Sequence, residues 1–427
     1  MSNDYSFAPA HLVNEMDQRM GEAQASATAF QTADDGAFSG RFLSYEGRQT
    51  LNFVCCSYLG LEQREDLKRA AITAIERLGV QFSCSRAVIQ SSQYSELEEA
   101  LGRMTGGKAI VSATTTLTHI AALPVLIGPR DVVVLDQQAH ASLHTACALL
   151  RVPIEVVRHS RMDHLEKRIQ ELSTKHERVW YVLDGVYSMV GDFAPIDALR
   201  DLLDRYPALH LYVDDAHSTS WSGTHGRGYA LERLPDRSRV VGVLSLNKAF
   251  SAGGGALILP DEQVAQRVRR AGGPLVFSGP LQPPLLAAAV ASAKLHLSEE
   301  LPSLQAALEK RIMRMVELCD EQEVPLADRS ISPIFFLRCR TAEKTFSMVK
   351  GLRETHGIYT SPAFFPVVPR GHAGVRITIS LHNTLEDIAK LVEALASESH
   401  RLDLDRSSGS RLTLARSASE LDSVKAS

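Results

Sequence analysis

The chain has 427 residues, 44% of them hydrophobic and 22% charged, which is ordinary for a globular protein large enough to fold without disulfides or metals. Its formal net charge is −4, which does not favour nucleic acid or an anionic membrane as a partner. No run of about 18 uninterrupted apolar residues is present, as a membrane span requires. The N-terminus lacks the basic start and apolar run of a signal peptide.

Composition and patterning predict four regions. Residues 1–50 read as an N-terminal arm, 51–285 as a large domain, 286–401 as a long helix with a smaller α+β domain, and 402–427 as a disordered, serine-rich tail. The six cysteines show no C-x2-C spacing, and the adjacent Cys55 and Cys56 cannot readily bridge. We therefore expect reduced thiols in a cytoplasmic protein.

Hydrophobic periodicity predicts a helix over 65–78 and then, from about residue 109, short valine-rich runs separated by helix-length segments. The runs cover 132–136, 154–159, 179–186, 209–217, 240–248 and 254–260. This pattern predicts an α/β fold with a mostly parallel sheet and helices on both faces. Ligands of such sheets bind at the carboxyl ends of strands. Three runs end in polar residues there, at Asp136, at Asp214–His217 and at Lys248.

The C-terminal part reads as a helical tract followed by alternating strands and helices. The tract runs from about residue 284 to 323. After it we expect a strand at 333–339, a helix at 342–356, a strand at 375–381 and a helix at 384–398. This order predicts the smaller α+β domain.

Two strand ends carry residues suited to a ring-shaped aldehyde cofactor. Lys248 precedes a glycine run, and a lysine that loses its proton by desolvation can attack an aldehyde. Asp214 can hold a pyridinium nitrogen protonated, and His217 can bond a phenolic oxygen of the same ring. The alternatives are a surface lysine in a flexible turn and a pair of turn or cap residues.

His140 is a candidate to lie flat over a planar cofactor. His140 and His144 have the spacing of a zincin helix, but Ala141 stands where that motif needs its glutamate. We therefore expect no metal site here.

Two segments are candidates for binding anions. Thr114, Thr115 and Thr116 precede an apolar helix, and a helix start with hydroxyls can cradle phosphate, or can simply be capped by threonine. Arg376 interrupts an apolar strand, and a buried guanidinium needs an anion, either a substrate carboxylate or an internal ion-pair partner. No dinucleotide fingerprint or Walker A loop occurs.

Taken together, these segments resemble the α-oxoamine synthases, a branch of the fold-type I pyridoxal-phosphate enzymes. The resemblance covers about residues 50 to 398 and rests on segments in a fixed order. They are SYLGL (57–61), SRAVIQ…ELEEAL (85–101), DQQAHASL (136–143), RHSRMDHLE (158–166), VYSMVGDFAP (186–195), VDDAHSTSWSGTHGRG (213–228), SLNKA (245–249), FSGPLQPP (277–284) and FPVVPRGHAGVRITISLHNTLEDI (365–388).

The resemblance implies pyridoxal phosphate as the cofactor and a role for each matching position. Lys248 matches the imine-forming lysine, Asp214 the pyridine-nitrogen partner, His217 the phenolic-oxygen partner and His140 the stacking histidine. Ser245, together with Ser278 from a neighbouring subunit, matches the phosphate-binding hydroxyls, Ser188 a serine near the cofactor and Arg376 the substrate-carboxylate arginine. A homodimer with shared active sites is implied.

The chain departs from the family pattern near the expected site. Thr114, Thr115, Thr116 and His119 stand where relatives commonly have Ser-Gly-aromatic-x-x-Asn. Cys56 replaces an asparagine that helps to hold the substrate carboxylate in relatives. Val190 replaces the usual aspartate of the Ser-Met-Asp-Gly-Asp segment. Some of these differences resemble the branch that makes α-aminoketone signalling molecules.

The implied reaction is the decarboxylative condensation of an amino acid with an acyl thioester, carried by coenzyme A or an acyl carrier protein. The products are an α-aminoketone, carbon dioxide and a free thiol. An aminotransferase or lyase on the same fold would keep the same central residues. A non-catalytic partner subunit is a further alternative, although such subunits lose the lysine that this chain retains as Lys248. The identity of the amino acid and of the acyl chain is left open.

Overall fold

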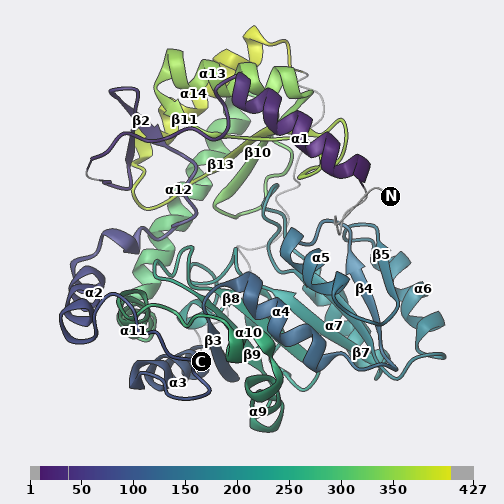
Figure 1. Ribbon diagram of the computed structural model, residues 1–427. Coiled ribbons are helices and arrows are strands. Elements are labelled where there is room, and N and C mark those ends of the chain that lie inside the picture. The colour runs from purple at the N-terminus through teal and green to yellow at the C-terminus, as the bar shows by residue number, and fades with distance from the viewer. Residues whose placement is uncertain (1–9, 37, 405–427) are drawn as a thin grey trace, which may run out of the picture.

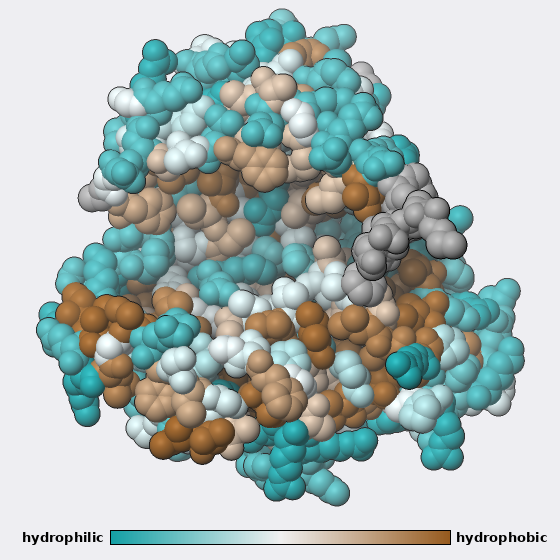
Figure 2. All heavy atoms as spheres, in the orientation of Figure 1, coloured by the Kyte–Doolittle hydropathy of each residue, from teal (hydrophilic) through white to brown (hydrophobic). Residues whose placement is uncertain are grey.

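The computed structural model describes residues 10–36 and 38–404. Most of the predicted tail, 405–427, lies outside these residues. A large sheet with its helices forms the lower part in Figure 1, and two small sheets with α1, α12, α13 and α14 form the upper part. Figure 2 shows a broad hollow between the two parts.

The lower part is built on a seven-stranded sheet in the order β3-β9-β8-β7-β6-β4-β5. All pairs from β5 to β8 are parallel, and β9 is antiparallel to both β8 and β3. The mostly parallel sheet predicted from the valine-rich runs is therefore confirmed. The strands are β3 (Lys108–Ser112), β4 (Val132–Asp136), β5 (Ile154–Val157), β6 (Val179–Asp184), β7 (Leu209–Asp214), β8 (Val240–Ser245) and β9 (Gly255–Leu259).

Helices cover both faces of this sheet because successive residues of each strand point to opposite sides. Val132 and Val134 of β4 enter one apolar core, while Val133 and Leu135 enter the other. The helices of this part are α2 (Glu65–Leu78), α3 (Ser92–Thr105), α4 (Thr115–Leu126), α5 (Ala141–Ala148), α6 (Met162–Leu172), α7 (Ile196–Arg205), α8 (Tyr229–Arg233), α9 (Glu262–Ala271), α10 (Gly273–Phe277) and α11 (Pro283–His296). The helix predicted over 65–78 is α2.

The upper part contains a three-stranded sheet β10-β13-β12 and a second one, β1-β2-β11. Its elements are α1 (Ala10–Ala25), β1 (Phe42–Tyr45), β2 (Arg48–Asn52), α12 (Leu301–Glu321), β10 (Ile334–Arg340), α13 (Ala342–His356), β11 (Ile358–Tyr359), β12 (Ser361–Ala363), β13 (Ala373–Thr378) and α14 (Leu385–Arg401). In the described residues no helix combines the length and apolar character that a membrane crossing needs.

The long helical tract expected over 284–323 is wrong in one respect, because it is two helices, α11 and α12. Residues 297–300 separate them, and Ser298 bonds back to the carbonyl of Leu295 through both its amide and its hydroxyl. Pro302 then lies in the first turn of α12, where its missing N–H costs nothing. The chain can therefore change direction between the lower and upper parts.

A cluster of hydrogen bonds around His159, the His159 clasp, joins the ends of β4, β5 and β6 at the carboxyl edge of the large sheet. His159, after β5, bonds Asp136 at the end of β4 at 2.9 Å and Asp192, after β6, at 2.8 Å. Tyr181 also donates to Asp136. Burial alone would lower the pKa of His159, but the two carboxylates outweigh it and raise the pKa to about 9.

The His159 clasp makes stability depend on pH in the alkaline range. The pKa of His159 is raised from 6.5 to about 9, so its contribution is complete below pH 6.5 and is lost as the pH rises through 9. At about 1.4 kcal/mol per pKa unit, the shift corresponds to on the order of 3 kcal/mol of folding free energy. Solvent screens little of this, because the His159 side chain is only 18% exposed. Urea unfolding of the wild type and His159→Gln should differ most near pH 6 and least near pH 10. A difference that stays constant over this range contradicts the linkage.

Candidate active site

The carboxyl ends of the parallel strands bring the polar residues flagged in the sequence to one edge of the sheet. Asp184 ends β6 and lies in register with Asp214, which ends β7. Lys248 follows β8 in a loop that is closed by a hydrogen bond from Leu246 N–H to Gly254 O. Gly254 has a φ of +104°, and a Cβ there would lie 2.7 Å from the backbone oxygen of Ser112. The loop therefore requires glycine at this position.

Asp214 is buried and ionised. Its Oδ2 lies 3.0 Å from His119 Nε2, and its Oδ1 accepts the backbone N–H of Ala216 at 2.9 Å. Burial raises the pKa of a carboxyl group, but the hydrogen bond from His119 and the positive charge of Lys248 outweigh burial and lower the pKa of Asp214 to about 2. Asp214 therefore presents a fixed negative charge to the site.

Lys248 faces this negative charge. Burial lowers the pKa of the Lys248 ammonium, although the negative charge of Asp214, followed by Cys56, opposes the shift. A lowered pKa leaves more of the free amine, which is the form that reacts with an aldehyde. The lysine and the aspartate predicted from the sequence are thus electrostatic neighbours.

Asp184 is a buried acid that the sequence analysis did not single out. One oxygen accepts the backbone N–H of His140 at 3.0 Å. Burial raises the pKa of Asp184 well above its ordinary value, and the charge of Asp214 adds to the shift. The rule that drew attention to Asp214, a polar residue that ends an apolar run, applies equally to Asp184 in VWYVLDG.

His217 is hydrogen-bonded to a tyrosine that precedes it by 159 residues. Its Nδ1 lies 2.8 Å from Tyr58 Oη, and both side chains are buried. Burial lowers the pKa of His217 well below its usual value, with Lys248 and Arg376 adding to the shift, so the ring is neutral. With Nδ1 bonded to Tyr58, the ring has Nε2 left for another partner.

Arg376 projects from β13 to the same region and is held by two contacts. Its Nε donates to the backbone oxygen of Ser188 at 2.6 Å, and its Nη2 lies 3.5 Å from Cys56 Sγ. Burial would raise the pKa of the Cys56 thiol, but the positive charges of Arg376 and Lys248 outweigh burial and lower it. Arg376 therefore has a sulfur partner where a carboxylate was expected to bind.

The remaining predicted residues lie around this centre or at its edge. His140 is the N-cap residue of α5, with Nδ1 2.7 Å from Ser142 Oγ. Ser245 is buried at the end of β8. Ser278 follows the short helix α10 and is part-buried. Within residues 10–36 and 38–404, Ser278 makes no hydrogen bond to the other candidate residues.

The threonine segment begins α4. Thr114 is the N-cap, and its hydroxyl accepts the backbone N–H of Leu117 at 3.1 Å. Thr115 and Thr116 form the first turn, where backbone N–H groups have no partner within the helix. The capping alternative therefore holds for Thr114, while the N–H groups of the first turn remain suited to an anion.

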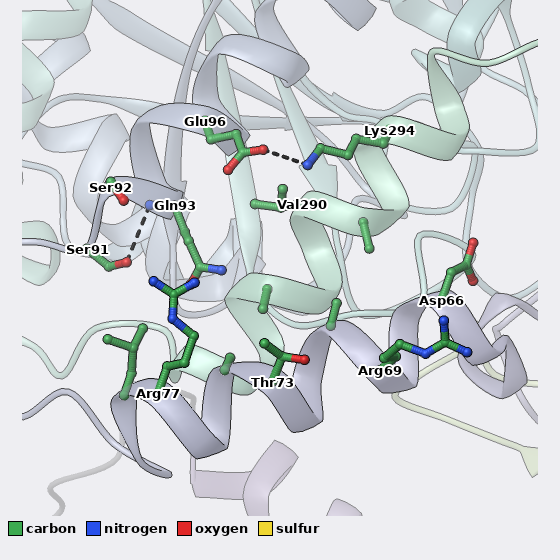
Figure 3. A pocket seen from close by; sticks show the side chains of 15 residues that line it. Asp66, Arg69, Thr73, Arg77, Ser91, Ser92, Gln93, Glu96, Val290 and Lys294 are labelled. Atoms are coloured by element: carbon green, nitrogen blue, oxygen red, sulfur yellow. Dashed lines mark hydrogen bonds and ion pairs between the residues drawn. The ribbon is translucent and has the colours of Figure 1, made fainter.

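A separate hollow of about 530 Å³ lies between α2, α3 and α11 (Figure 3). Alanines and Val290 form much of its wall, and Arg69, Arg77 and the Glu96–Lys294 ion pair surround it. It contains none of the residues that the sequence analysis assigned to the site.

Comparisons with known proteins define the class. The sequence matches the family described as aminotransferase class I and II over residues 49–395. It is 34% identical to 8-amino-7-oxononanoate synthase of Geobacter sulfurreducens over 361 residues, or 82% of this chain and 89% of that protein. A variant of serine palmitoyltransferase from S. paucimobilis, with a bound aldimine of pyridoxal phosphate and myriocin, has a TM-score of 0.85 at 23% identity, covering 92% of this chain and 98% of that one. An 8-amino-7-oxononanoate synthase from Francisella tularensis has a TM-score of 0.71 at 21% identity, covering 83% and 99%.

The chain belongs to the class I and II aminotransferase family and, within it, to the α-oxoamine synthases. It has the fold-type I architecture and is a pyridoxal-phosphate-dependent acyltransferase. Its reaction type is the decarboxylative condensation of an amino acid with an acyl thioester. The aminotransferase, lyase and non-catalytic alternatives are not favoured by these relatives.

The charge beside Cys56 has a direct chemical consequence. Cys56 should react with iodoacetamide at lower pH than its neighbour Cys55, because Arg376 lowers the pKa of Cys56 while burial raises that of Cys55. Mass spectrometry of the peptide that carries both thiols measures the two labelling profiles, and both thiols are part-buried. In Arg376→Gln the Cys56 profile should move to higher pH. Identical profiles for the two cysteines would exclude the effect.

Proposed function

We propose that this condensation takes place around Lys248, Asp214 and Arg376, with the amino acid held between the large sheet and β13. The observation that carries the proposal is the buried, ionised Asp214 beside a lysine of lowered pKa. Such opposed shifts at the end of neighbouring strands are typical of functional sites.

The donor set fits pyridoxal phosphate. Asp214 supplies an anion for a protonated ring nitrogen, Lys248 an amine for an aldehyde, and the start of α4 backbone N–H groups for a phosphate. When bound, the cofactor supplies the electron sink for carbanion chemistry at the amino acid's α-carbon. His140 would lie over its ring, and Ser188 near it.

Three sets of residues orient the reactants. His217, whose Nδ1 is bonded to Tyr58, would bind the phenolic oxygen through Nε2. Ser245, the start of α4 at Thr114–Thr116 and Ser278 of the partner subunit would hold the phosphate. Arg376, fixed by the Ser188 carbonyl, binds the substrate carboxylate, with Cys56 beside it.

Lys248 also moves the proton that the reaction requires. With the cofactor and the amino acid bound, the Lys248 amine would take the α-proton, and its lowered pKa favours the free base that this step needs. The cofactor would supply the electron sink that lets the α-carbon bond to the thioester carbonyl, with release of the thiol and then of the carboxylate as carbon dioxide. Lys248 would then return a proton to the α-carbon.

We propose that the enzyme acts in the cytoplasm. All six cysteines are unpaired, which is typical of the reducing cytoplasm. The acyl group would arrive on coenzyme A or on an acyl carrier protein.

The proposal is tested by replacing the central lysine. Lys248→Ala should release no thiol from any pair of amino acid and acyl thioester that the wild type uses, because both its covalent and its base roles are lost. The assay crosses a panel of amino acids with acyl-CoA and acyl-carrier thioesters and follows free thiol and carbon dioxide. Lys310→Ala, on the exposed face of α12, is the matched control and should keep full activity. Thiol release by Lys248→Ala at the wild-type rate would overturn the role of Lys248.

We also propose a homodimer with shared active sites. Exposed apolar side chains gather on α2, on the segment after it and on α10 and α11; they are Ile72, Ile75, Leu78, Val80, Val88, Ile89, Phe277 and Leu285. Phe277 is 89% exposed and directly precedes Ser278. A large exposed aromatic next to a residue assigned to the partner's site supports an interface there.

Phe277→Asp should weaken the dimer, since a charge in an apolar interface is left without a partner. Sedimentation velocity over a range of protein concentrations measures the shift towards monomer, and turnover should fall with the dimer fraction. Val156→Asp, on the exposed edge strand β5, introduces the same charge away from this surface and should not change assembly. A wild type that is monomeric at all concentrations would exclude the dimer.

A further inference from the structure

A chain of hydrogen bonds runs beneath the site from Tyr212 through His119 to Asp214. Tyr212 Oη lies 3.0 Å from His119 Nδ1, and His119 Nε2 lies 3.0 Å from Asp214 Oδ2. Tyr212 and His119 are fully buried, and Asp214 is 5% exposed. Tyr212 and Asp214 are two residues apart on β7, so they point to the same face, and His119 reaches them from α4.

The chemistry of the three groups fixes the direction of the bonds. Ionised Asp214 can only accept, so His119 Nε2 carries the proton of the bond to Asp214. Burial raises the pKa of Tyr212 well above its usual value, with Asp214 adding to the shift, so the phenol stays protonated. A phenol that donates to Nδ1 places the imidazole proton on Nε2.

Asp214 has acceptor capacity left after these bonds. Each oxygen of a carboxylate has two lone pairs, and Ala216 N–H takes one of those on Oδ1 while His119 takes one on Oδ2. The other ionisable groups that face Asp214 are Lys248, His140 and Asp184. In the described residues, His119 is the one ionisable side chain that is hydrogen-bonded directly to the Asp214 carboxylate.

We propose that His119 is a positioning residue for the condensation, and that Tyr212 holds His119 in the orientation that this task requires. The inference rests on the proposed function, because it assigns Asp214 to a ring nitrogen. Asp214 and that nitrogen share one proton. The Nε2–H donor of His119 stabilises the charged carboxylate, which keeps the proton on the ring nitrogen, where it makes the ring an electron sink.

Activity measurements on three variants separate this role from simple packing. His119→Leu removes the donor at similar volume and should lower kcat by about tenfold or more, as expected for a hydrogen bond to a charged group, with KM for the amino acid within about threefold. In His119→Gln the side-chain amide can still donate near the Nε2 position, and it should stay within about threefold of the wild-type kcat. Equal losses in the two variants would show that only packing matters.

Tyr212→Phe tests the far end of the chain. It should lower kcat by about twofold to fivefold in the wild type and should have no further effect in His119→Leu, because Tyr212 acts only through His119. Independent, additive losses would overturn the proposed order of the three residues.

A spectroscopic measurement tests the proton position without turnover. In protein loaded with pyridoxal phosphate whose ring nitrogen is isotope-labelled, the NMR chemical shift of that nitrogen at neutral pH reports whether it is protonated. His119→Leu should move the spectrum towards the neutral ring, while His119→Gln should match the wild type. Unchanged spectra in His119→Leu would exclude the proposal. If the wild type binds the cofactor but releases no thiol, the proposed function fails. The spectra then still test whether His119 keeps the ring nitrogen protonated.

Discussion

An ionised carboxylate in the protein interior is the constraint on which this site depends. Burial of a charge costs several kcal/mol unless donors and opposite charges offset it. Asp214 meets this condition through His119, the backbone N–H of Ala216 and the nearby Lys248. These partners come from α4, from the loop after β7 and from the loop after β8, so the buried charge of Asp214 is compensated only where these three segments pack together.

The charge of Asp214 also affects the pKa values of the groups around it. Asp184 lies in register with Asp214, and two adjacent buried acids cannot both be ionised at low cost, so the pKa of Asp184 is raised while that of Asp214 is lowered. At the upper side, burial lowers the pKa of His217 and the charges of Lys248 and Arg376 add to the shift, while the same two charges lower the pKa of Cys56 against burial. The site thus contains one fixed anion facing cations, with neutral donors between them.

Local signals in the sequence predicted much of this arrangement. Valine-rich runs that end in Asp214 or precede Lys248 indicated both the strands and the edge where they converge, because strand pattern and strand end are properties of neighbouring residues. Pairings between distant residues left no such signal. Tyr58 and His217 are 159 residues apart, His119 and Asp214 are 95 apart, and Arg376 reaches a carbonyl 188 residues away. The break at residues 297–300 was missed although Pro302 is a sequence signal for a helix start; Ser298 and the glutamates around it are compatible with a helix, and the bonds back to Leu295 end α11 there.

The departures from the family pattern lie at both ends of the site. His119 and Cys56 both stand where relatives commonly carry asparagine, an amide that stays neutral at all pH values. Here His119 contacts the anion Asp214, and Cys56 contacts the cation Arg376. His119 can donate its Nε2 proton to the carboxylate while Nδ1 accepts from Tyr212, and Cys56 faces the guanidinium with a thiol whose pKa the charges of Arg376 and Lys248 lower. The substitutions that weaken the sequence match therefore give Asp214 a hydrogen-bond donor and Arg376 an acceptor.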